Sequence, residues 1–276
     1  PFIIALAIAS NVGGTATLIG DPPNIMIASA AGLSFNSFIF NLTPIVIFLL
    51  GILFIFQWLF FRRQMHVPYE RRARVMELDE KKVLNNTPLM IKSLSILALV
   101  ILGFFFHSVI ELEPSMIALL GASLLMVLAT PHEIDELLHE VEWGTILFFI
   151  GLFILVGGLV EVGVMKWLAE KIISITKGNL TLTAMLIVWL SGILSAVVDN
   201  IPYVATMIPL IKAMETSFGA AGLLPLWWSL SLGACLGGNG TLVGASANVV
   251  SVGIARKSGH PISFWDFTKY GILYTL

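Results

Sequence analysis

Long uncharged runs dominate the chain, and they set the first expectation about its fold. No Asp, Glu, Lys, Arg or His interrupts residues 1–20, 22–61 or 218–255. A helix needs about 20 mainly apolar residues to cross the hydrocarbon core of a bilayer. On this measure the pattern predicts membrane-spanning helices over residues 42–61, 89–110, 115–130 and 143–160. The chain is therefore expected to be an all-α polytopic membrane protein.

The composition agrees with this expectation and excludes other classes of protein. Hydrophobic residues make up 57% of the chain and charged residues only 12%, whereas ordinary globular domains carry about 25% charge. The net charge of −2 excludes the basic surface of a nucleic-acid-binding protein. The single cysteine, Cys235, excludes a disulfide framework and a cysteine-cluster metal site, and we expect it to serve in packing. The lipid bilayer is the expected partner, and the plasma or inner membrane of a prokaryote the expected location.

The basic residues indicate how the chain is oriented. Eight of the fifteen Lys and Arg fall in or beside the loop of residues 62–92, which the positive-inside rule makes cytoplasmic. Counting spans from this loop places residues 161–178 outside, as an amphipathic helix in the membrane interface. The eight residues are Arg62, Arg63, Arg71, Arg72, Arg74, Lys81, Lys82 and Lys92.

The apolar segment of residues 180–217 is interrupted by Asp199 and Asn200. The arm that follows has only eleven uncharged residues, 201–211, before Lys212, which is too short for a crossing. We therefore expect a re-entrant hairpin that enters from outside and turns at Asp199. A carboxylate at this depth marks a functional site by default. The alternative is that Asp199 only caps the hairpin by accepting hydrogen bonds from backbone N–H groups.

Two glycine-rich stretches reveal an internal repeat. When Gly13 is aligned with Gly237, GGTATLIGDPPN (13–24) and GGNGTLVGASAN (237–248) share six of twelve positions. Two related halves are the simplest explanation, and the number of spans between them makes the halves inverted. We expect the counterpart of the hairpin about 25 residues before Pro1, so that the chain is a fragment truncated at both ends. A second similarity between the halves pairs Ser34, Phe35 and Phe38 with Ser263, Phe264 and Phe267.

These features divide the chain into three regions. Residues 1–61 are the end of the first repeat, a broken helix plus the following span, and residues 62–92 are the cytoplasmic loop. Residues 93–276 are the second repeat. It comprises scaffold spans (93–160), the interfacial helix (161–178), the hairpin (180–217), a broken helix (225–255) and the start of a last span (263–276).

The two glycine-rich stretches are predicted to be broken helices that carry the functional site. Glycine weakens a helix, and interrupted helices at matching positions of inverted repeats point to the midplane site of a secondary transporter. Asp21 precedes Pro22, so a half-helix should restart there, and Ser246 is expected to cap the second restart. The alternative is that the glycines only let helices pack closely. The candidate binding residues are Asn11, Gly13, Gly14, Thr15, Thr17, Asp21, Asn24, Asp199, Asn200, Gly237, Gly238, Asn239, Thr241 and Asn248.

Three motifs carry a resemblance to a known family: SNVGGTATLIGDPPN (10–24), SAVVDNIPYVATMIPLI (195–211) and GACLGGNGTLVGASANVVSVGIA (233–255). With them the chain resembles the ArsB/NhaD permeases of the ion transporter superfamily, which have a citrate transporter-like domain, and most of all their P-protein-like members. The resemblance implies two inverted repeats, each with a scaffold part and a transport part, a homodimer and elevator-type alternating access. The dicarboxylate transporters of this superfamily carry Ser-Asn-Thr at the hairpin tip, where this chain has Val198, Asp199 and Asn200. Substrate and coupling ion therefore stay open.

The function expected is ion-coupled secondary transport of a small inorganic or organic anion, arsenite-like or a carboxylate. A sodium/proton antiporter is the alternative within the family. We expect no cofactor beyond Na⁺ or H⁺ as the coupling ion, with Na⁺ near Asp199, Asn200 and Gly238. We do not expect an enzyme, because an intramembrane hydrolase with Asp21 and Asp199 as its carboxylate pair lacks the GxGD motif that would support it. A passive channel is a further possibility, and flux measurements would distinguish it.

Overall fold

The computed structural model describes residues 2–61, 87–129, 134–139 and 143–275, together with the isolated positions 69, 73, 76 and 141. All regular structure in these residues is helical, which confirms the predicted all-α fold. The chain divides into two compact units, residues 1–64 with 147–276 and residues 65–146. Within the described ranges, the helices long and apolar enough to cross a membrane are Phe35–Leu59, Thr87–Ile110, Trp143–Glu161, Leu180–Val197 and Glu215–Gly240.

Helix α3 (Phe35–Phe61) is longer than its apolar run predicted. It begins at Phe35 rather than at residue 42, because the hydroxyl of Ser34 accepts a hydrogen bond of 3.1 Å from the backbone N–H of Ser37 and so caps the first turn. Pro44 lies inside the helix, which membrane helices tolerate when neighbouring groups satisfy the freed backbone atoms.

The predicted loop of residues 62–92 ends earlier than the sequence indicated. Residues 87–92 form the first turns of α6 (Thr87–Ile110), where Pro88 is accepted because the first N–H groups of a helix have no internal partner. The ammonium of Lys92 donates a hydrogen bond of 3.0 Å to the carbonyl of Leu128. The other basic residues of the loop lie outside the described residues, and their cytoplasmic placement stays a prediction.

The smaller unit contains a helical hairpin. Helix α6 packs against α7 (Pro114–Ala129), and α8 (Ile134–His139) follows. Glycines allow close contact between the first two helices, since an added Cβ at Gly103 would meet Ile117 and one at Gly121 would meet Val100.

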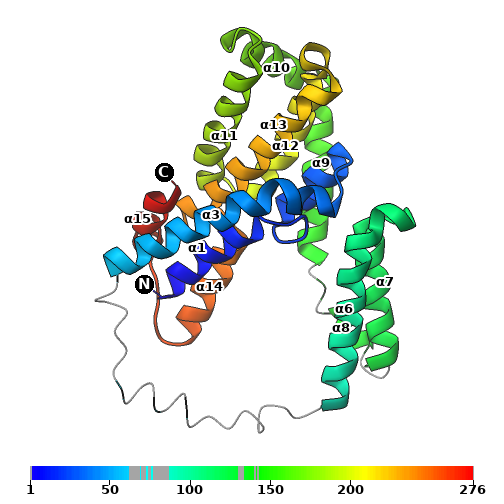
Figure 1. Ribbon diagram of the computed structural model, residues 1–276, viewed down its shortest axis with the longest axis vertical. Coiled ribbons are helices and arrows are strands. Elements are labelled where there is room, and N and C mark those ends of the chain that lie inside the picture. Colours follow the sequence, from blue (N-terminus) through cyan, green and yellow to red (C-terminus); the bar gives the residue numbers. More distant parts are fainter. Residues whose placement is uncertain are drawn as a thin grey trace. The chain divides into compact units, whose positions relative to one another are not determined.

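The larger unit contains both glycine-rich stretches, and each is interrupted. Helix α1 (Phe2–Gly14) ends before a non-helical stretch, and α2 (Pro22–Ala31) restarts after it. Helix α13 (Glu215–Gly237) continues as a single 3₁₀ turn, η1 (Gly238–Gly240), and α14 (Ser246–Lys257) restarts beyond it. Helix α1 lies beside α3 and α14 (Figure 1). The prediction of two broken helices is thus confirmed.

The second broken helix differs in detail from the prediction. It begins at Glu215 rather than at residue 225, with a kink at Gly219, whose φ of 69° and ψ of 167° are not helical. Ser246 does not cap the restart, because the N-cap position is Ala245 and Ser246 is already the first helical residue. After the restart, α15 (Phe264–Thr275) packs on η1.

The hairpin consists of α11 (Leu180–Val197) and α12 (Asn200–Ala213), joined by Val198 and Asp199. It follows α9 (Trp143–Glu161) and α10 (Val164–Ile175). Helix α10 is amphipathic and packs on α12, with Met165 and Ala169 buried while Trp167 is 56% exposed. These features fit the predicted interfacial helix.

Candidate functional site

Two asparagines close the two breaks in the same way. In the first break, the Asn24 amide donates hydrogen bonds of 3.2 and 3.0 Å to the carbonyls of Thr15 and Thr17. In the second, the Asn248 amide donates bonds of 2.8 and 2.9 Å to the carbonyls of Gly238 and Thr241. Each asparagine lies in the first turn of its restarting half-helix. It thereby satisfies carbonyls that the interruption has freed from the helix, as buried backbone groups require.

The breaks are also held to each other, although they lie at opposite ends of the sequence. The Asn11 amide in α1 donates to Oδ1 of Asn239 at 2.9 Å and to Oδ1 of Asn248 at 2.8 Å. In the opposite direction, Oδ1 of Asn24 accepts from the Ser231 hydroxyl at 2.6 Å and from the Cys235 thiol at 3.5 Å. These side chains are all buried. The two glycine-rich stretches therefore lie next to one another and share one polar network.

The chain crosses itself closely inside each break. A Cβ added at Gly20 would fall on the carbonyl of Gly14, and one at Gly244 would lie 2.7 Å from the carbonyl of Gly238. The two pairs occupy equivalent positions when the repeats are aligned. Only glycine permits this approach, which explains why these positions recur in both repeats.

The tip of the hairpin contacts both breaks through one residue. The backbone N–H of Asn200 donates to the carbonyl of Gly244 at 3.3 Å. Its side-chain amide lies 3.4 Å from each carboxylate oxygen of Asp21. The hairpin is further tied to the second break by the Thr241 hydroxyl, which donates to the carbonyl of Ala196 at 2.5 Å. Asn200 is thus the point at which hairpin, first break and second break meet.

Asp21 sits at the predicted N-cap position of α2 but does not cap it. Its side chain makes no capping bond. Pro22 and Pro23 occupy the first two helical positions and have no N–H to offer, and the N–H of Asn24 donates to the backbone carbonyl of Asp21 at 3.0 Å instead. The carboxylate is instead turned toward the hairpin and is only 7% exposed. The same local sequence that starts the half-helix therefore leaves a buried carboxylate available for another partner.

Asp199 has the geometry of the capping alternative. Its Oδ1 accepts a hydrogen bond of 3.0 Å from the backbone N–H of Ile201, so it caps α12. The side chain is half-buried. Of the two candidate carboxylates, Asp21 is therefore the more deeply buried and Asp199 the one with a local backbone partner.

Most of the candidate residues come together, and three do not: Asp199, which caps α12, and the glycines Gly237 and Gly13. Gly237 packs helix against helix, since a Cβ there would lie 2.5 Å from the carbonyl of Gly192 in α11, and Gly13 has open space around it. The residues that join the network or line the breaks are Asn11, Gly14, Thr15, Thr17, Asp21, Asn24, Asn200, Gly238, Asn239, Thr241 and Asn248.

Sequence reasoning missed three members of the network: Ser195, Ser231 and Cys235. The hydroxyl of Ser195 in the hairpin donates to the carbonyl of Ala234 at 2.7 Å. Cys235, expected to serve only in packing, contacts Asn24. A signal for it was present, because the alignment of the repeats sets Cys235 against Asn11 and makes the two residues counterparts.

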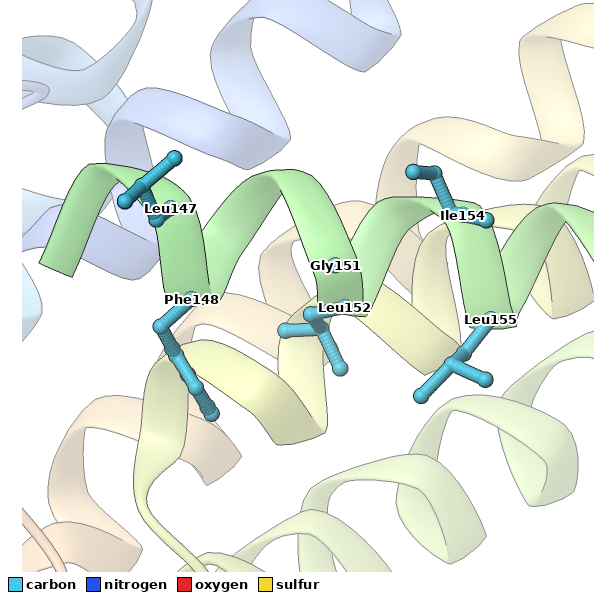
Figure 2. A pocket seen from close by; sticks show the side chains of 6 residues that line it. All are labelled: Leu147, Phe148, Gly151, Leu152, Ile154 and Leu155. Atoms are coloured by element: carbon cyan, nitrogen blue, oxygen red, sulfur yellow. The ribbon is translucent and has the colours of Figure 1, made fainter. Parts of the chain in front are cut away.

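The described residues offer neither a metal-binding cluster nor, in the pocket along α9, a polar site for an ion. They contain no group of three or more His, Cys, Asp or Glu side chains that could hold a metal ion. Figure 2 shows a pocket along α9 that is lined by apolar residues and glycine alone. It offers an ion no polar ligand. The lining residues are Leu147, Phe148, Gly151, Leu152, Ile154 and Leu155.

Comparison with known proteins agrees with the resemblance drawn from the motifs. The family model described as citrate transporter matches residues 1–233. An uncharacterized transporter of Mycobacterium tuberculosis is 47% identical over 276 residues, covering 99% of this chain and 64% of the relative. A 46 kDa membrane protein of Mycobacterium leprae is 46% identical over 277 residues, covering 100% and 64%. The P protein of Mus musculus is 34% identical over 349 residues, covering 98% and 42%.

Proposed function

Because this chain belongs to the citrate transporter family, we propose that the full-length protein is a secondary transporter that moves a small anion across the membrane, coupled to Na⁺ or H⁺. The chain spans 64% of the length of the mycobacterial relatives, so the activity of the whole protein is inferred from the part described above. The transported anion is arsenite-like or a carboxylate.

One observation carries the proposal: Asn200 at the hairpin tip contacts both interrupted helices. Its backbone N–H reaches Gly244 in one break and its side chain reaches Asp21 in the other. A transporter needs a binding site whose walls can move relative to one another, and broken helices meeting a hairpin supply it. A packing role for the glycines alone would not require polar contacts between hairpin and breaks.

The chemistry of the breaks suits an anion together with a cation. Half-helices α2 and α14 begin at the breaks, where their positive dipole ends attract negative charge. Asn239 is fully buried, and its Nδ2 has no hydrogen-bond acceptor among the residues that the structure describes. An oxygen of an arsenite-like or carboxylate anion, or a water molecule, would satisfy it.

We propose that transport follows elevator-type alternating access in a homodimer. In such a mechanism the hairpin and broken helices move together against the scaffold. The hydrogen bonds from Ser195 and Thr241, which tie hairpin and second broken helix together, support this. Inversion of the two repeats is part of the same proposal.

The test is uptake by the full-length protein in proteoliposomes, with sodium and proton gradients imposed separately. We expect saturable uptake of a carboxylate or of arsenite, driven by one of the two gradients. Sodium efflux driven by a proton gradient, without anion uptake, would instead identify the antiporter. Flux that neither saturates nor responds to either gradient would indicate a passive channel and contradict the proposal.

A further inference from the structure

Asp21 is a buried carboxylate with no cationic side chain paired to it among the described residues. The residue is 7% exposed, and no Lys, Arg or His of the described residues forms an ion pair with it. Its polar neighbours are neutral: the amide of Asn200, at 3.4 Å from each oxygen, and the thiol of Cys235, which lies 3.5 Å from Oδ1 of Asn24. The first contact is long for a hydrogen bond, and a thiol is a weak donor. A buried charge of this kind is costly unless something neutralises it.

The break itself does not need this charge. Asp21 and Ala245 are equivalent when the repeats are aligned, and both are N-cap residues of a restarting half-helix. Their backbones agree, with φ −142° and ψ 132° at Asp21 and φ −153° and ψ 147° at Ala245. Since alanine supports the same backbone in the second repeat, the carboxylate in the first repeat has a purpose other than shaping the turn.

The surroundings of Asp21 define what can bind there. The elements packed against α2 are α12 and α13. The titratable groups that act on Asp21 from them are the carboxylate of Asp199, which precedes α12, and the thiol of Cys235 in α13. Both are acids, so neither supplies a positive charge, and the two carboxylates repel each other when both are ionised.

We propose that Asp21 is the site at which the coupling cation, sodium or a proton, binds and is released. Asn200 is the hairpin residue whose contact with Asp21 depends on whether the cation is bound. This proposal rests on the proposed function and assigns its coupling ion to a residue. One positive charge on Asp21 neutralises its carboxylate, so the hairpin tip can remain closed over the break. Loss of the cation restores the uncompensated carboxylate, which favours separation of the tip from the break and entry of water.

The assignment differs from the expectation drawn from sequence, which put the coupling ion near Asp199, Asn200 and Gly238. Asp199 already holds a backbone N–H and is half-buried, so its charge has a local partner and water. Asp21 has neither advantage. Asn200 is common to both assignments, and the two carboxylates can be separated by substitution.

The experiment uses the purified full-length protein and four variants. Asp21→Asn and Asp21→Ala remove the charge, and the second variant reproduces the residue found at Ala245. Asp199→Asn tests the competing carboxylate. Asp135→Asn, at an exposed position of α8, controls for the same chemical change elsewhere. The melting temperature is measured in sodium chloride against choline chloride at fixed pH, and then across pH at fixed ionic strength.

A ligand that binds only the folded state raises the melting temperature. We expect wild type and Asp135→Asn to show the same rise with sodium, or with protons. Asp199→Asn should retain a rise, reduced at most by the loss of one neighbouring negative charge, and both Asp21 variants should lose it. A response to sodium identifies the ion as sodium, and a response to pH alone identifies it as a proton. The proposal is overturned if the Asp21 variants respond like wild type, if Asp199→Asn loses the response, or if wild type shows none. Failure of both Asp21 variants to insert, while Asp199→Asn inserts, would make the charge structural and also overturn it.

Melting does not depend on transport, so the two proposals can fail separately. If wild type transports none of the anions but the Asp21 variants alone lose the cation response, the cation site stands and the proposed substrate class falls. If transport is found and its dependence on sodium and pH survives in Asp21→Ala, the transporter stands and the assignment of Asp21 falls.

Discussion

The amide of Asn11 donates a hydrogen bond of 2.8 Å to Oδ1 of Asn248, the residue that closes the second break. The alignment of the two repeats makes Asn11 equivalent to Cys235 and Asn248 equivalent to Asn24. Correspondingly, the thiol of Cys235 lies 3.5 Å from Oδ1 of Asn24. Each first half-helix thus reaches across to the break of the other repeat from the same position. In one direction the contact is a hydrogen bond from a side-chain amide, and in the other it is a weak hydrogen bond from a thiol.

The first prediction concerns the closing asparagine of the second break. Replacing Asn248 with alanine leaves the carbonyls of Gly238 and Thr241 without their side-chain donor, and removes one of the two acceptors of Asn11. Each buried group left unpaired costs about 1–3 kcal/mol. We therefore expect a clear fall in the melting temperature of the detergent-solubilised protein.

Asn41→Ala is the matched control for this change. Asn41 is exposed, and its side chain bonds only the carbonyl of Ser37 within its own helix. It should melt close to wild type. Equal melting temperatures for Asn248→Ala and Asn41→Ala would show that the polar closure of the break adds nothing to stability.

The second prediction concerns the contact between α15 and η1. A Cβ added at Gly271 would fall on the carbonyl of Asn239 and lie 2.9 Å from that of Gly240. Overpacking of this kind costs about 1–3 kcal/mol, so Gly271→Ala should lower the melting temperature. It should also reduce uptake, because the backbone that would move belongs to the second break.

Gly253→Ala provides the comparison, since Gly253 is an exposed helical glycine with no atom within 4 Å of an added Cβ. Alanine is favoured over glycine in a helix by about 1 kcal/mol. This variant should melt at or above the wild-type temperature. Loss of stability in both variants would point to a general intolerance of substitution rather than to the contact at η1.

The elements of the fold were largely predictable from the sequence, because membrane helices leave a strong local signal. The apolar runs predicted the long helices α3, α6 and α9, and the Asp-Pro-Pro restart predicted the beginning of α2 at Pro22. Helix α7, also predicted as a span, is a shorter apolar helix. Two local details were not predicted, and only the first depends on a side-chain hydrogen bond. Ser34 extends α3 toward its N-terminus, and Ala245 rather than a polar residue holds the cap of α14.

The composition of the site was predictable only where the repeat showed it. Gly14, Asn24 and their counterparts stand out because both copies keep them. The partners of these residues come from distant segments, as with the bond between Ser231 in α13 and Asn24 in α2. A single sequence does not show which distant residues contact one another. The separation of roles between Asp21 and Asp199 likewise depends on which one the fold buries.

The third prediction uses Cys235 as a reporter. It is the only cysteine and has no exposed surface, so maleimide should modify the folded protein slowly and the denatured protein completely. Asn24→Ala removes the acceptor that the thiol contacts and leaves space beside it. The rate of modification should then rise by about tenfold or more, as for a local opening made easier by roughly 1.4 kcal/mol or more. An unchanged rate, measured by mass spectrometry, would show that this contact does not restrict access to Cys235.

The last prediction concerns orientation. Residues 62–92 concentrate the basic residues of the chain, and the positive-inside rule assigns such a segment to the cytoplasm. Met76 in this segment is 86% exposed, and Glu113, in the turn between α6 and α7, is exposed as well. A span between them places the two positions on opposite sides.

In intact cells, an impermeant maleimide should therefore label Glu113→Cys and leave Met76→Cys unlabelled until the membrane is permeabilised. The parent protein, without either substitution, is the control for background labelling. Because both variants are read in the same cells, the opposite pattern would reverse the topology and make the hairpin open from the cytoplasm, whereas labelling of both would mean that α6 does not cross.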